Sequence, residues 1–114
     1  MNWTPICPLQ DILPNTGVGA LIDGHQAAIF RLDDDQVFAI DNFDPHSRAN
    51  VLSRGIVGDL GGELVVASPV YKQHYRLRDG VCLENPEHSV SAHHTRIRDG
   101  VVEVAMHAAV SVAA

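Results

Sequence analysis

The chain has 114 residues and a formal net charge of −6, with eight Lys and Arg against fourteen Asp and Glu. A chain of this length forms one domain with a sizeable core, so it needs neither a metal nor a disulfide to hold it together. The acidic balance leaves no surface that neutralises phosphates, which excludes nucleic acid and an anionic membrane surface as expected partners.

The N-terminal segment, M-N-W-T-P-I-C-P, lacks the basic region and the apolar run of a signal peptide. No stretch reaches the ~20 apolar residues that cross a bilayer. The sequence therefore predicts a cytoplasmic protein. Because such proteins usually keep their thiols reduced, Cys7 and Cys82 are predicted to be free and largely buried, with their pairing left open.

The pattern along the chain indicates β-strands. Residues 18–42 contain three short apolar runs, separated by Asp23-Gly24 and by the acidic triplet at 33–35. Asp-Gly between apolar runs predicts a hairpin, because both central residues of the tight turn need positive φ. The same pair returns at 79–80 and at 99–100, and glycines around Asp59 predict a further hairpin. Seven or more short strands without an amphipathic helix indicate an antiparallel β-sandwich or barrel.

Two segments interrupt the spacing of the hairpins. Residues 43–54 are F-D-P-H-S-R-A-N-V-L-S-R, and residues 68–74 are S-P-V-Y-K-Q-H. In each, a proline follows a small polar or acidic residue, and a histidine or tyrosine lies just beyond it. Loops of this kind at the ends of neighbouring hairpins can face each other.

The order of N-F-D-P-H, L-S-R-G-I-V-G-D and V-V-A-S-P-V-Y-K-Q-H-Y-R-L resembles a Rieske-type ferredoxin domain. In that family a C-x-H box and a C-x-x-H box hold a [2Fe–2S] cluster at the tips of two loops. The resemblance implies an all-β Rieske-like fold, with a small loop-rich subdomain at about 42–77 that corresponds to the cluster-binding insertion. Asp44 and Ser68 match the two cysteines, and His46 and Tyr71 match the two histidines.

Three of these four ligand positions are therefore replaced. A Rieske cluster needs thiolates on one iron and imidazoles on the other. Aspartate is a hard oxygen ligand, and serine and tyrosine hydroxyls are poorly ionised near neutral pH. We expect no cluster, no metal and no catalytic residue in this chain.

A narrower resemblance rests on W-T-x-I-C-x-L, L-S-R-G-I-V-G-D and A-S-P-V-Y-K-Q-H. These runs are similar to the small subunits of cytoplasmic NAD(P)H-dependent nitrite reductases, which convert nitrite to ammonium. The resemblance implies a large partner subunit that carries FAD, sirohaem and an iron–sulfur cluster. It also implies that this chain is an accessory subunit, inactive when isolated.

We expect the two loops to form the surface that docks on the partner, because Rieske proteins present the equivalent loops to theirs. The candidate contact residues include the Arg and aromatic types that are enriched at the centres of interfaces. They are Phe43, Asp44, His46, Arg48, Val70, Tyr71 and Lys72. Two simpler interpretations stay open. Asp44 can instead open a local turn, and Tyr71 can be a core residue.

A different class of function is also open. Asp44, His46 and Tyr71, with His74 as a further candidate, are acceptable ligands for a single iron or a similar metal. This set would make the chain a stand-alone metalloprotein. No acid–base or nucleophile–base arrangement with a recognisable spacing accompanies it. Metal bound to the isolated chain would distinguish this function from that of an accessory subunit.

Overall fold

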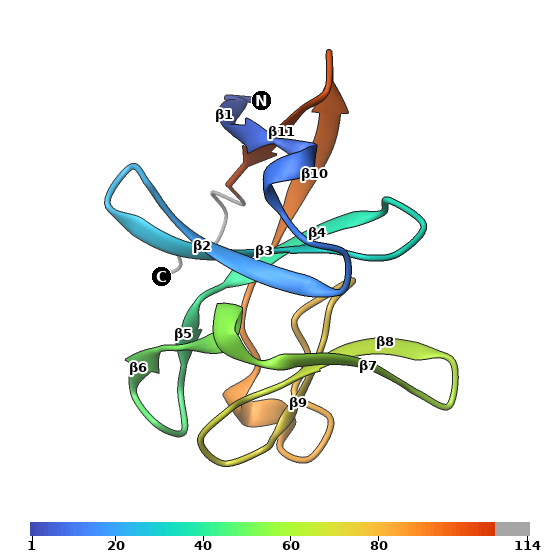
Figure 1. Ribbon diagram of the computed structural model, residues 1–114. Helices are drawn as coiled ribbons and strands as arrows, with labels where there is room; N and C mark the ends of the chain where they lie inside the picture. Colours follow the sequence, from blue (N-terminus) through green and yellow to red (C-terminus); the bar gives the residue numbers. More distant parts are fainter. Residues whose placement is uncertain (107–114) are drawn as a thin grey trace.

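The computed structural model describes residues 1–106, which form strands joined by turns and short 3₁₀ helices (Figure 1). The strands are β1 (Thr4–Pro8), β2 (Thr16–Ile22), β3 (His25–Arg31), β4 (Val37–Asp41), β5 (Phe43–Asp44), β6 (Ala49–Asn50), β7 (Ile56–Leu60), β8 (Glu63–Ala67), β9 (His74–Arg76), β10 (Ala92–Arg98) and β11 (Val101–Ala105). The 3₁₀ helices are η1 (Leu9–Asp11), η2 (Leu52–Arg54) and η3 (Pro86–His88). The all-β prediction is confirmed.

The strands form one large and two small antiparallel sheets. The large sheet has six strands in the order β1-β11-β10-β4-β3-β2, and the small sheets are β7-β8-β9 and β5-β6. In Figure 1 the small sheets lie below the large one. Since β4 and β10 are neighbours in the large sheet, residues 42–91 form an insertion between them. No helix among the described residues is long and apolar enough to span a membrane.

The predicted Asp-Gly hairpins differ in outcome. Asp23-Gly24 joins β2 to β3 with φ of 50° and 82°, and the pair at 99–100 joins β10 to β11 with φ of 53° and 77°. The pair at 79–80 also reverses the chain, although only Gly80 has positive φ, 78°. Arg76 donates its N–H to the carbonyl of Val81 at 2.8 Å, and Leu83 donates its N–H to the carbonyl of His74 at 2.9 Å. The second arm of this hairpin is short, since its one β-bridge joins Cys82 to Tyr75.

Strand β3 is buried on both faces, which explains its uninterrupted apolar run. On one face, Ala28 and Phe30 pack with residues of the insertion such as Leu52, Val66 and Tyr75. On the other face, the alternate residues of β3 pack inside the curved large sheet against Ile12, Val102 and Val104. The insertion is thus fastened to the large sheet by an apolar core. Both cysteines are free thiols, with Cys82 buried and Cys7 partly buried.

Candidate functional site

Two loops in the insertion share one backbone design. The first loop, residues 44–48, closes when Arg48 donates its N–H to the carbonyl of Asp44 at 2.7 Å. The second loop, residues 68–72, closes in the same way, with the Lys72 N–H on the carbonyl of Ser68 at 3.1 Å. The closing residues both have positive φ, 60° at Arg48 and 61° at Lys72. The similar loop sequences, D-P-H-S-R and S-P-V-Y-K, therefore produce similar turns.

The buried carboxylate of Asp44 joins these loops. Its Oδ1 accepts hydrogen bonds from the backbone N–H of His46 at 2.9 Å and from the hydroxyl of Tyr75 at 3.0 Å. Its Oδ2 accepts from the hydroxyls of Ser47 at 3.0 Å and Ser68 at 2.5 Å. A carboxylate offers about four lone-pair sites, so all of them are occupied. The expectation that the two loops face each other is confirmed by the bond from Ser68.

The hydrogen bonds keep Asp44 ionised despite its burial. Burial alone would raise the pKa of this carboxyl, but donation from Ser68, from the His46 N–H, from Tyr75 and from Ser47 outweighs burial and lowers the pKa. Burial and the neighbouring Asp44 carboxylate raise the pKa of Tyr75, so its hydroxyl keeps the proton that it donates. The link between the loops is therefore a charge-assisted one near neutral pH.

A third segment approaches the first loop. The Nε2 atom of His46 lies 2.9 Å from Nδ1 of His88 on η3, and the centroids of the two rings are 4.2 Å apart. The ring of His46 also meets the ring of Tyr71 at 6.4 Å in an edge-on arrangement. Nearby, His74 donates its backbone N–H to Glu84 at 2.7 Å. Residues 84–88 thus belong to the same end of the molecule as the two loops.

Most of the predicted contact residues lie on the surface. Tyr71 is 61% exposed, so the interpretation of this residue as part of the core is wrong. Phe43 and Val70 are also exposed, as are Arg48 and Lys72, whereas His46 is half-buried. Asp44 does not lie on the surface, contrary to its prediction as a partner contact. Its side chain has no exposed surface, because it opens the turn of the first loop and binds the second.

The sequence interpretation did not include three residues of this site. Tyr75 and Ser47 supply two of the hydroxyls on Asp44, and the ring of His88 meets that of His46 edge-on. Ser47 had a local signal, since a serine three residues after an aspartate often bonds back to it. Tyr75 and His88 had none, because both meet their partners through the folded chain.

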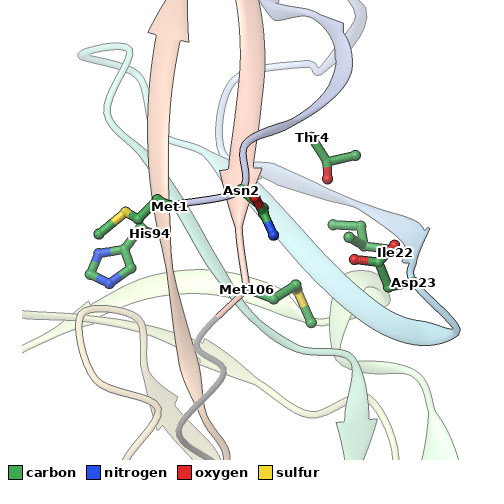
Figure 2. Close-up of a pocket in the computed structure, with 7 residues that line it drawn as sticks. All are labelled: Met1, Asn2, Thr4, Ile22, Asp23, His94 and Met106. Atoms are coloured by element: carbon green, nitrogen blue, oxygen red, sulfur yellow. The ribbon is translucent and has the colours of Figure 1, made fainter.

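A pocket of about 470 Å³ lies away from the loops (Figure 2). It is lined by Met1, Asn2, Thr4, Ile22, Asp23, His94 and Met106, which come from the ends of strands in the large sheet and from the N-terminal residues. None of the loop residues discussed above lines it. Within residues 1–106, no three His, Cys, Asp or Glu side chains gather in a way that could hold a metal.

Known proteins share this fold and much of this sequence. The family model of the Rieske-like [2Fe–2S] domain matches residues 2–105. The nitrite reductase (NADH) small subunit of Salmonella typhimurium is 53% identical over 104 residues, which cover 90% of this chain and 96% of that protein. The chain belongs to the Rieske-like domain family, as a nitrite reductase (NADH) small subunit.

Members of this small-subunit family also match in structure. The Escherichia coli protein NirD superposes with a TM-score of 0.84 at 51% identity, covering 90% of this chain and 94% of that one. The predicted Rieske-like fold is confirmed by these matches. A further relative is the nitrite reductase [NAD(P)H] large subunit of Klebsiella oxytoca, which is 48% identical over 102 residues. Those residues are 90% of this chain but 11% of that protein, so the similar region is a small part of a much longer chain.

The donor set of the two loops does not fit the cluster after which the family is named. Such a cluster needs thiolates on at least one iron. The two cysteines lie on β1 and in the core, and the loops themselves contain none. At the loops, the carboxylate of Asp44 accepts four hydrogen bonds, one of them from the hydroxyl of Ser68. The alternative metal set of Asp44, His46 and Tyr71 stays a prediction.

Proposed function

We propose that the chain is the accessory small subunit of a cytoplasmic NAD(P)H-dependent nitrite reductase and works without a cluster of its own. It docks through its two loops on a large subunit that carries FAD, sirohaem and an iron–sulfur cluster and converts nitrite to ammonium. The isolated chain is inactive. The observation that carries the proposal is the loop surface itself, where a saturated polar link supports exposed apolar side chains.

Three exposed apolar residues distinguish this surface. Phe43 precedes the first loop with 43% of its surface exposed, and Val70 and Tyr71 in the second loop are 49% and 61% exposed. Exposed apolar groups beside polar ones are typical of docking sites, and tyrosine is among the residues that most often dominate binding energy. The rigid attachment of both loops lowers the entropy that binding would cost.

The Klebsiella oxytoca relative supports the choice of partner. Its large-subunit chain contains a region similar to nearly all of this chain. A domain that is covalently part of one large subunit is a reasonable non-covalent companion of another, because fusion and complex formation place the same surfaces together. We therefore place the docking surface for this chain on the large subunit of its own enzyme.

Removing two aromatic side chains tests this proposal. The variant carrying Phe43→Ala and Tyr71→Ala should bind the purified large subunit at least about tenfold more weakly, since each truncation at an interface centre costs about 1–2 kcal/mol. Biolayer interferometry with immobilised large subunit measures the affinity. The matched control carries Leu13→Ala and Leu21→Ala, two leucines that are 71% and 68% exposed outside the insertion.

The control variant should bind as the unmodified chain does. Equal affinities for all three proteins would overturn the docking surface, and no binding by the unmodified chain would overturn the choice of partner. A separate measurement of iron content tests the proposal that the chain holds no cluster of its own. The chain purified from its own complex should hold no iron after it is separated from the large subunit.

A further inference from the structure

The backbone conformation at two basic residues is unusual. Six non-glycine residues among those described have positive φ. Four of them are Asn15, Asp23, Asp35 and Asp99, and aspartate and asparagine tolerate this region. The other two are Arg48 and Lys72, which gain no such tolerance from their side chains. They occupy equivalent places, because each closes its loop.

Among residues 1–106, these two residues also lack ion pairs. Four of the other cations are paired with carboxylates: Arg31 with Asp35, Arg76 with Asp79, Arg78 with Glu63, and Arg96 with Glu103. In residues 1–106, the arginines and lysine without a carboxylate in salt-bridge range are Arg48, Arg54, Lys72 and Arg98. Three of these four lie in the insertion, and two of them are the strained residues.

The acidic groups are distributed in the opposite way. Between residues 43 and 58 the single acidic residue is Asp44, which is buried and fully hydrogen-bonded, and residues 68–73 contain none. The neighbouring segment 84–88 adds Glu84, which is paired with His74, and the exposed Glu87. The two loops themselves thus carry exposed cations and no exposed carboxylate, on a chain with a net charge of −6. A neutral or basic partner would gain nothing from this arrangement, whereas an acidic one would be attracted to it.

We infer that Arg48 and Lys72 are recognition residues that bind acidic side chains on the partner, on either side of the site that receives Tyr71. This inference rests on the proposed function, and it adds the chemistry of the partner surface: carboxylates that flank an apolar pocket. Strain at a loop position is retained where the side chain has a use, since glycine would fit the same backbone without it. Within the part of the chain that the structure describes, neither side chain forms a salt bridge.

Replacement by glycine separates recognition from folding. The variant with Arg48→Gly and Lys72→Gly should melt at the same temperature as the unmodified chain or up to about 5 °C higher, because relief of strain opposes the added freedom of the unfolded chain. It should associate with the large subunit about tenfold more slowly at low ionic strength. That difference should shrink as salt rises from about 0.05 M to 0.5 M, since salt screens exposed charges.

Two matched variants complete the experiment. Arg98→Ala removes an unpaired cation from β10 of the large sheet and should leave association unchanged. The exchange of Arg48→Lys with Lys72→Arg keeps both charges and should retain association. Stopped-flow association and thermal melting of all four proteins provide the two readouts.

The outcomes are distinct. A lower melting temperature for the glycine variant would assign the two side chains to folding and overturn the inference. An association rate that changes neither with salt nor with the glycine replacements would also overturn the inference. The proposed function would still stand in that case, provided that the unmodified chain binds the large subunit. If the unmodified chain does not bind the large subunit, both fail. Binding of nitrite by the isolated chain that depends on the two cations would replace the acidic partner with a free anion.

Discussion

The large sheet and the insertion differ in the types of residue that adopt positive φ. In the large sheet, positive φ falls on Asp23-Gly24 and Asp99-Gly100, where the residue types suit the turn. In the insertion it falls on glycines at the turns between strands but, in the two loops, on Arg48 and Lys72. The loops keep residues that a stability-driven choice would replace, which is typical of a functional surface.

The interiors of the large sheet and the insertion differ as well. The cluster inside the large sheet is entirely apolar. The three buried polar residues among those described, Asn42, Asp44 and Ser68, all lie at the bases of the loops and at the start of the insertion. The Oδ1 of Asn42 accepts a hydrogen bond from the N–H of Ser53 at 2.7 Å and so holds η2 in place. Apolar packing holds the insertion in place, and directional polar bonds shape its loops.

The largest effect should come from the apolar boundary between these regions. Phe30 on β3 is fully buried and packs with residues of the insertion. Phe30→Ala should lower the free energy of unfolding by about 3–5 kcal/mol, because it removes a buried ring and leaves a cavity. Urea unfolding measures the change, and Leu21→Ala, at a 68% exposed position, is the control. A loss no greater than that of the control would mean that the insertion is not held by this core.

Local patterns predicted much of this architecture. Asp-Gly pairs favour reversal of the chain, and a hairpin is confirmed at each of the three. At 79–80 only Gly80 has positive φ, so a longer turn replaces the tight two-residue turn that the pair predicts. The two D-P and S-P loops were likewise visible, since a short polar side chain before proline caps its own turn.

The burial of Asp44 was not predictable in the same way. The hydroxyls of Ser68 and Tyr75 are 24 and 31 residues away along the chain, and His88 is 42 residues from His46. No spacing rule connects such distances, because strand order decides which loops meet. The family resemblance indicated that the loops converge. It did not indicate that a saturated carboxylate would lie where they join.

The polar link at Asp44 should give the next largest effect. Asp44→Asn replaces an acceptor-only group by an amide whose nitrogen would face hydroxyl donors, leaving buried donors unsatisfied. We expect the free energy of unfolding to fall by about 2–3 kcal/mol. Asp33→Asn, in the exposed acidic turn, is the matched control and should change little. Urea unfolding at neutral pH compares the two, and equal losses would deny any special role to Asp44.

The pH dependence of this loss has a definite sign. The pKa of Asp44 is lower in the folded chain than the value of about 3.9 in an unfolded one. Its contribution to stability is therefore complete above about pH 4 and disappears as the pH falls through the folded value. The difference in free energy of unfolding between the unmodified chain and Asp44→Asn should be constant from about pH 8 to 5 and should decrease below about pH 4. A difference that increases in acid would contradict an ionised Asp44.

The smallest effect should distinguish a link between the loops from a local turn. Ser68→Ala removes the 2.5 Å hydrogen bond between the loops but leaves the bond from the His46 N–H to Asp44. The loss of stability should be about 1–2 kcal/mol, as for one hydrogen bond to a charged group. Amide hydrogen exchange should quicken at Lys72 and also at Arg48, because either loop then opens without the other. Faster exchange confined to the second loop would mean that each turn is held by its own residues, and that the loop surface is not a single preorganised unit.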